Sequence, residues 1–133
     1  MFIRNQIQLI LGRIKGPRKF IQVIAGPRQV GKTTLVDQAI RKSKVALHFV
    51  SADETTSASA GWIDQQWETA RLLARSQKTK TAVLIIDEIQ KIEDWSKHVK
   101  KNWDSDTRNK IKLKVILLGS AQLLLQKGLT ESL

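Results

Sequence analysis

GPRQVGKT, residues 26–33, is the stretch that decides the fold of this 133-residue chain. It matches the pattern G-x-x-x-x-G-K-[ST] at every position. Gly26 and Gly31 let the backbone curl, so that successive N–H groups point inward at phosphate oxygens. We expect Lys32 to reach the β- and γ-phosphates of a nucleotide and the Thr33 hydroxyl to bind Mg²⁺. The pattern therefore predicts a phosphate-binding loop between a strand and a helix.

Apolar runs on both sides of this loop alternate between strand-like and helix-like patterns. They predict strands over residues 20–25, 46–50, 82–86 and 115–118. Helical spacing predicts helices over residues 3–14, 32–43, 62–76, 92–103 and 122–125, with a polar loop over residues 51–61. Strands separated by helices indicate an α/β fold. We predict a P-loop NTPase fold with three α/β/α layers, a mainly parallel sheet of about four strands, and one domain spanning residues 1–133.

Two carboxylates follow the apolar run of residues 82–86, in the sequence AVLIIDE. Ligands of open α/β sheets bind at the carboxyl ends of the strands. We therefore expect Asp87 to hold Mg²⁺ through water and Glu88 to polarise an attacking water. A GTPase is disfavoured, because residues 87–90 read DEIQ rather than Asp-x-x-Gly. A small-molecule kinase is also disfavoured, since an Asp-Glu pair suits attack by water better than transfer to an alcohol.

Gly119 and Ser120 follow the last predicted strand. One interpretation sets the Ser120 hydroxyl near the γ-phosphate or the attacking water. The other is a Gly-Ser turn in which Ser120 caps the next helix. The spacing fits both interpretations.

The composition of the chain limits the kinds of metal site, cross-link and partner that it can have. The chain has no cysteine and two histidines, which excludes disulfides and thiolate metal sites and disfavours structural zinc. No apolar run is long enough to span a bilayer, so we expect a cytoplasmic protein without a membrane partner. The four tryptophans are expected to pack helices onto the sheet rather than to stack on nucleic-acid bases.

The net charge is +11, from 23 basic and 12 acidic residues. Such an excess favours polyanion partners, although scattered lysines are equally typical of a solvated face. The alternative function is therefore a nucleic-acid-binding module in which nucleotide is a switch or a vestigial ligand. Its predicted basic face consists of Lys97, Lys100, Lys101, Arg108, Lys110, Lys112 and Lys114.

Three segments together resemble one family, the prokaryotic AAA+-like ATPases with an AAA_14 domain. They read GPRQVGKTTL at residues 26–35, IIDEIQKI at residues 85–92 and LLGSAQLLLQKGLTESL at residues 117–133. The resemblance covers nearly the whole chain and implies ATP and Mg²⁺ as cofactors. It implies that Asp87–Glu88 is the Walker B pair and Ser120 the sensor-1 position, while Gln90 matches the family's D-E-x-Q pattern. The implied Walker A loop consists of Gly26, Pro27, Arg28, Gln29, Val30, Gly31, Lys32, Thr33 and Thr34.

The chain departs from the family pattern after residue 133. There the family normally continues into a further strand and arginine-bearing segments. The resemblance therefore implies an N-terminal portion that lacks the fifth strand. It permits self-association in which an arginine is donated across subunits. The expected function is ATP binding and Mg²⁺-dependent hydrolysis that drives a conformational change, with Glu88, Lys32 and Ser120 as the catalytic residues.

Overall fold

The structure, a computed structural model, describes residue 18 and residues 21–26, 45–54 and 60–120. The helices predicted over residues 3–14, 32–43 and 122–125 lie outside these residues. So does the phosphate-binding loop beyond Gly26.

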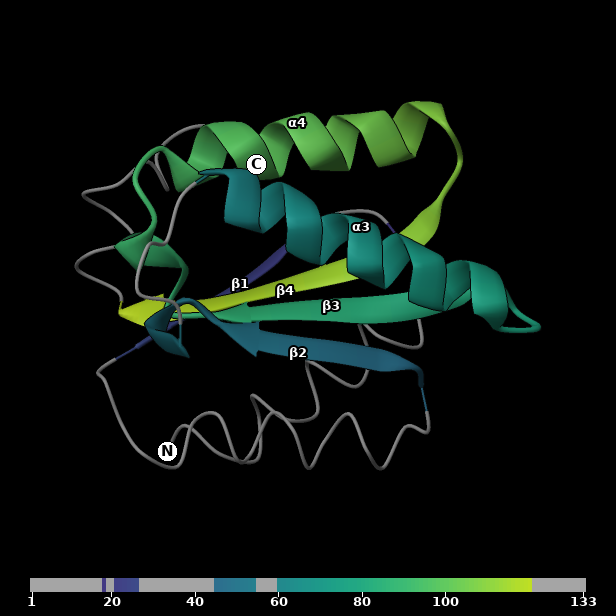
Figure 1. Ribbon diagram of the computed structural model, residues 1–133, viewed down its shortest axis with the longest axis horizontal. Coiled ribbons are helices and arrows are strands. Elements are labelled where there is room, and N and C mark those ends of the chain that lie inside the picture. Colours follow the sequence, from purple (N-terminus) through teal and green to yellow (C-terminus); the bar gives the residue numbers. More distant parts are fainter. Residues whose placement is uncertain (1–17, 19–20, 27–44, 55–59, 121–133) are drawn as a thin grey trace.

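Four strands form one sheet in the described part of the chain: β1 (Gln22–Gly26), β2 (Leu47–Ser51), β3 (Thr81–Asp87) and β4 (Lys112–Ser120). Their spatial order is β1-β4-β3-β2, and every neighbouring pair is parallel (Figure 1). Parallel neighbours need a crossover connection, which α3 supplies between β2 and β3 and α4 between β3 and β4. The predicted parallel α/β sheet is confirmed.

Two helices, α3 (Ala60–Ser76) and α4 (Trp95–Arg108), cover one face of the sheet (Figure 1). The predicted loop over residues 51–61 is wrong at both ends. Ser51 completes β2 and the short 3₁₀ helix η1 (Ala52–Glu54) follows it, while α3 begins at Ala60. Helix α4 begins later than predicted, because the 3₁₀ helix η2 (Ile89–Lys91) and a left-handed Asp94, with φ 59°, come before it.

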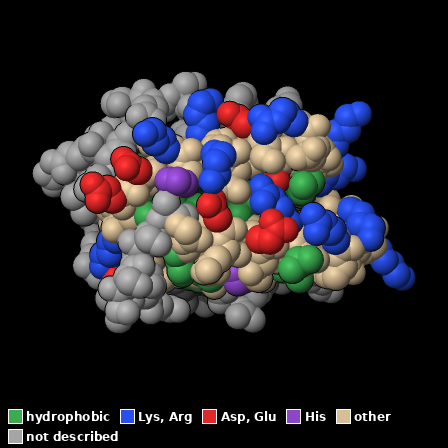
Figure 2. All heavy atoms as spheres, turned by 45° about the horizontal axis from the view of Figure 1, so that its top comes forward, with side chains coloured by type: hydrophobic (Ala, Val, Ile, Leu, Met, Phe, Trp, Pro, Cys, Tyr) green, Lys and Arg blue, Asp and Glu red, His purple; other side chains and the backbone are tan. Residues whose placement is uncertain are grey.

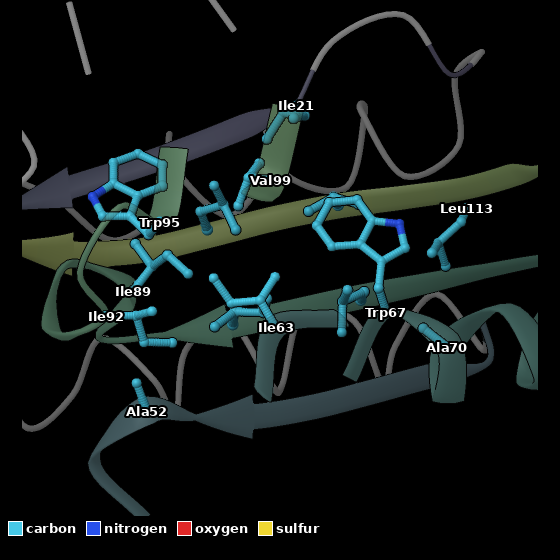
Figure 3. Close-up of a cluster of buried hydrophobic side chains, with 14 of the residues drawn as sticks. Ile21, Ala52, Ile63, Trp67, Ala70, Ile89, Ile92, Trp95, Val99 and Leu113 are labelled. Carbon is cyan, nitrogen blue, oxygen red and sulfur yellow. The ribbon is translucent and has the colours of Figure 1, made fainter. Parts of the chain in front are cut away.

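The main hydrophobic core lies between these helices and the sheet (Figure 3). Trp67 and Trp95 are fully buried in it, and Trp62 and Trp103 pack against it half-buried. The tryptophans therefore pack helices onto the sheet, as predicted. The second face of the sheet is also buried, with an apolar cluster that consists of Val83, Ile85, Ile116 and Leu118. A sheet that is apolar on both faces is what three-layer packing requires.

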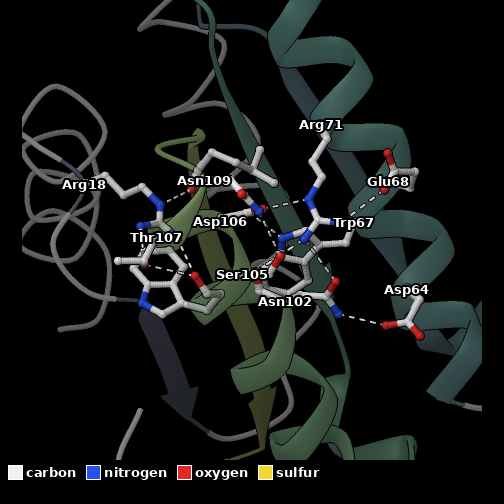
Figure 4. A network of polar contacts seen from close by, with 12 residues as sticks. Arg18, Asp64, Trp67, Glu68, Arg71, Asn102, Ser105, Asp106, Thr107 and Asn109 are labelled. Atoms are coloured by element: carbon white, nitrogen blue, oxygen red, sulfur yellow. Dashed lines mark hydrogen bonds and ion pairs between the residues drawn. The ribbon is translucent and has the colours of Figure 1, made fainter.

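A buried polar network joins α3 to α4 (Figure 4). Asp106 of α4 is fully buried, and its carboxylate accepts hydrogen bonds from Trp67 Nε1 at 2.8 Å and Arg71 Nε at 2.7 Å. Arg71 also donates to Asn102 Oδ1 at 3.1 Å, and Asn102 Nδ2 donates to Asp64 Oδ1 at 2.8 Å. These directional contacts fix the two helices relative to each other. No helix in the described residues has the length and apolar character to cross a membrane.

Candidate functional site

The carboxyl ends of β1, β4 and β3 lie side by side at one end of the sheet. Gly26, the last residue of β1, pairs with Ser120, the last residue of β4. Asp87 ends β3, and β4 separates β3 from β1. Since neighbouring strands are about 4.8 Å apart, β1 and β3 are separated by roughly 10 Å. The start of the loop and the two carboxylates therefore lie on either side of the end of β4, a spacing that a phosphate chain can bridge.

The predicted loop residues other than Gly26 lie outside the described part of the chain, so the roles of Lys32 and Thr33 remain predictions. The Gly26 backbone completes β1, where the loop was expected to begin. Ser120 completes β4, which places its backbone next to Gly26. This position is the one that the sensor interpretation requires, although the role of the Ser120 hydroxyl also remains a prediction.

Asp87 and Glu88 form a sharp turn at the end of β3. The carboxylate Oδ1 of Asp87 accepts the Glu88 backbone N–H at 2.9 Å, and both residues are buried. Glu88 has φ 55° and ψ 40°, the left-handed region. That conformation costs a non-glycine residue about 1–2 kcal/mol and persists where the surrounding structure enforces it, often at functional sites.

Gln90 holds the Glu88 carboxylate. Its Nε2 donates to Glu88 Oε2 at 2.8 Å, and the Glu88 and Gln90 side chains are only 6% and 4% exposed. The other amide atom, Gln90 Oε1, is buried and has no hydrogen-bond partner among the described residues. Buried polar atoms are almost always paired. An unpaired acceptor beside a carboxylate therefore suits a donor from beyond the described residues, such as a water or a ligand hydroxyl.

Lys91 links this turn to the end of β2. Its ammonium group forms an ion pair with Asp53 of η1 and lies 4.0 Å from Glu88 Oε2. Asp53 was not among the predicted site residues, because residues 51–61 were interpreted as a featureless loop. The available signal was the position of Asp53 three residues after a predicted strand, since parallel strands end at the same side of a sheet.

The donor chemistry at this end of the sheet fits a magnesium–nucleotide complex. Mg²⁺ is usually held by one or two carboxylates together with substrate phosphates and water. Asp87 supplies a carboxylate at the end of β3. Within the described residues no three His, Asp or Glu side chains gather into a site of their own. This donor set fits a cation that takes most of its ligands from phosphate and water.

A family model described as an AAA domain, AAA_14, matches residues 18–133. The chain belongs to this family. The match covers β1 with its loop, the Asp87–Glu88 turn and the end of β4, so the resemblance seen in the three segments is confirmed. Family membership supports a nucleotide-binding ATPase kind of function for this AAA domain.

Solved structures similar to this AAA domain include RuvB from Thermotoga maritima, in a point variant, with a TM-score of 0.56 and 19% identity. Another, described as "Structural Basis for Katanin Self-Assembly", has a TM-score of 0.52 and 23% identity. The alignments cover 89% of this chain but only 37% and 40% of those chains. At these identities the likeness concerns the fold. No curated protein matches the sequence.

Proposed function

We propose that this AAA domain binds ATP with Mg²⁺ at the carboxyl end of its sheet and hydrolyses it. The observation that carries the proposal is the convergence of three strand ends: Gly26 beside Ser120, with the Asp87–Glu88 turn on the next strand. In this arrangement Lys32 and Thr33 follow Gly26 closely enough in sequence to face the two carboxylates. A bound Mg²⁺ would neutralise phosphate charge and orient the phosphates, with Thr33 and Asp87 holding it.

Glu88 is the proposed general base. A base must lie within hydrogen-bond reach of the water that it activates, directly or through one more water. Gln90 fixes one oxygen of the Glu88 carboxylate through its Nε2, while its own unpaired Oε1 can accept a hydrogen bond from that water. The two side chains would then hold the water from two sides. Ser120, at the end of the neighbouring strand, is the proposed sensor of the γ-phosphate.

The contact of Lys91 with Asp53 and Glu88 supports a conformational change coupled to hydrolysis. Lys91 is nearer to Asp53 and only 4.0 Å from Glu88 Oε2, so a shift of η2 would exchange one partner for the other. We propose that a change of charge at the γ-phosphate determines whether Lys91 pairs with Asp53 or with Glu88. The change of partner would move η1 relative to η2. We also propose self-association, in which a neighbouring copy supplies an arginine to the phosphates.

The experiment that tests this function is a titration of ATP into the wild-type chain and into Lys32→Ala, in the presence of Mg²⁺. Loss of the ammonium group removes the point charge that the β- and γ-phosphates require, so binding is expected to weaken at least about 100-fold. Lys97→Ala, an exposed lysine of α4, is the matched control and should bind like the wild type. Equal affinity of the wild type and Lys32→Ala would reject the proposal.

The alternative, a nucleic-acid module with a vestigial nucleotide site, predicts the opposite pattern. In that case ATP would bind weakly to both chains, and Lys32→Ala would leave every measured property unchanged. The buried Glu88–Gln90 hydrogen bond favours the ATPase, because a left-handed turn is costly for a non-glycine residue and is typical of functional sites.

Gln90→Leu tests the proposed positioning of the base. The variant removes both the donor to Glu88 and the unpaired oxygen, so ATP turnover is expected to fall about 10- to 100-fold. The Kd for ATP should stay near that of the wild type, because leucine fills a similar volume. The free energy of unfolding is expected to fall by about 1–3 kcal/mol, because the buried Glu88 carboxylate loses its hydrogen bond from Gln90. Gln65→Leu, at an exposed site of α3, is the control. A loss of ATP affinity equal to the loss of rate would assign Gln90 a structural role instead.

A further inference from the structure

The amino ends of β3 and β4 lie at the end of the sheet opposite the candidate nucleotide site, and a hollow of about 440 Å³ opens there. The eight residue steps from Lys112 to Ser120 in β4, at about 3.3 Å each, separate this hollow from Ser120 by roughly 26 Å. The described residues that line it are rich in cations and hydroxyls: Arg18, Thr81, Asp106, Thr107, Lys110, Ile111, Lys112 and Lys114.

Arg18 is held rigidly in this hollow. Its guanidinium carbon lies 3.5 Å from the centroid of the Trp103 ring, within the range of a cation–π contact. Its Nε, Nη1 and Nη2 donate to Leu113 O, Thr107 Oγ1 and Trp103 O. These three acceptors are uncharged, and no carboxylate of the described residues contacts the guanidinium directly (Figure 4).

Burial lowers the pKa of the Arg18 guanidinium, although attraction to Asp106 and Asp104 opposes the effect. Burial also lowers the pKa of the Lys114 ammonium. Both cations have therefore given up part of their hydration. A bound anion would restore some of that stabilisation.

The nearby carboxylates already have other hydrogen-bond or ion-pair partners. Asp106 is the one carboxylate among the described lining residues, and Arg71 and Trp67 already occupy both of its oxygens. Asp104 forms an ion pair with Lys100 at 3.3 Å. Lys110 and Lys112 form no ion pair within the described part of the chain. Among the described residues, Lys110 and Lys112 therefore give the hollow positive charge that no ion pair offsets.

The positive surface extends beyond this hollow. A second hollow of about 390 Å³ shares Thr81 with the first and is lined by Lys78 and Thr79. Residues 77–81 and 108–114 contain no acidic residue. Figure 2 shows Lys and Arg side chains gathered at this end of the molecule, where α3 and α4 end. We call this surface the basic end; it consists of Arg18, Lys78, Lys80, Lys110, Lys112 and Lys114.

The predicted basic face thus divides into two parts. Lys100 pairs with Asp104, and Lys101 pairs with Asp64 at 3.1 Å on the exposed side of α4. Those lysines form a mixed-charge surface. The lysines of the basic end lie on turns and strand starts instead, away from acidic neighbours in sequence.

We propose that the basic end binds the phosphate backbone of a nucleic acid, independently of base sequence. Arginine, lysine and threonine side chains are the usual contacts to phosphate oxygens, and two adjoining hollows suit an extended chain of phosphates better than a single small anion. Leu72 of α3 is the only large apolar side chain exposed in the described residues, and one such side chain is a weak anchor for a lipid surface. The proposal does not depend on ATP hydrolysis.

The test is fluorescence anisotropy with labelled single-stranded and duplex oligonucleotides, at salt concentrations from about 50 to 200 mM. The variant Lys110→Ala/Lys112→Ala is compared with Lys97→Ala/Lys100→Ala, which removes the same charge from α4. We expect the first variant to weaken binding by tenfold or more and to reduce the salt slope by about two, one for each lysine–phosphate pair that it removes. The second should change the affinity less than threefold. Both should bind ATP like the wild type, so a failure here is separate from a failure of the ATPase proposal.

Four results would overturn the proposal. The first is no oligonucleotide binding by the wild type at the lowest salt. The second is an equal loss of affinity in the two variants, which would mean that only net charge matters. The third is displacement of the oligonucleotide by polyglutamate of equal charge as effectively as by unlabelled DNA, which would assign the basic end to acidic proteins. Sedimentation with anionic lipid vesicles that equals the oligonucleotide affinity would likewise assign it to a membrane surface.

Discussion

Replacement of Asp106 by alanine is expected to lower the free energy of unfolding by about 3 kcal/mol and the melting temperature by about 10 °C. The carboxylate is fully buried between α3 and α4 and accepts hydrogen bonds from Trp67 Nε1 and Arg71 Nε. Its loss leaves the buried Trp67 N–H without an acceptor. It also leaves a mostly buried guanidinium whose remaining carboxylate contact, Glu68, is exposed. Removal of one partner of a buried ion pair is among the most destabilising single changes.

Asp104→Ala is the matched control, because it removes the same group from the same helix. Asp104 is half-exposed and pairs with Lys100 on the surface, where such pairs contribute about 0–1 kcal/mol. Chemical denaturation of the two variants and the wild type gives the comparison. A cost for Asp106→Ala no larger than that for Asp104→Ala would show that the buried network does not hold the two helices together.

This network could not be anticipated from the sequence. In α4, residues 95, 99, 102 and 106 share one helical stripe, but only Trp95 and Val99 are apolar. The helix was therefore predicted to end at residue 103, where the apolar pattern stops. It continues to Arg108, since Asp106 is buried by its contacts with α3 rather than by its own hydrophobicity.

The strands were easier to predict, because a strand buried on both faces is an uninterrupted apolar run. Residues 82–86 and 115–118 both lie within observed strands. The early start of β4 was missed, since Lys112 and Lys114 alternate with buried Leu113 and Val115. At this alternation β4 passes from the basic end, where it begins, into the core.

At the candidate site, motif spacing correctly assigned Gly26, Asp87 and Ser120 to the ends of three strands. It could not give the order of those strands, in which β4 lies between the other two. Nor could it give the Gln90 contact with Glu88 or the bridge from Lys91 to Asp53, since both depend on the turn after β3. The roles proposed for the loop residues beyond Gly26 rest on the motif alone.

Glu88→Gln is expected to keep ATP binding and to lose turnover. Glutamine has nearly the same shape, and its carbonyl oxygen can still accept the hydrogen bond from Gln90 Nε2, so the turn should be preserved. The amide cannot take a proton from water. A general base contributes about 10²–10⁴ in rate, which sets the expected loss at a factor of about 100 or more. Glu93→Gln, an exposed position soon after η2, makes the same chemical change outside the site and should turn over ATP like the wild type.

The measurement that tests the proposed hydrolysis most directly is the rate of phosphate release from saturating ATP by the wild type and Glu88→Gln, with Mg²⁺ and with EDTA. We predict release by the wild type that stops in EDTA and falls at least about 100-fold in Glu88→Gln, while both chains bind ATP equally. Release that persists in EDTA, or equal rates in the two chains, would contradict a Mg²⁺-dependent ATPase with Glu88 as its base.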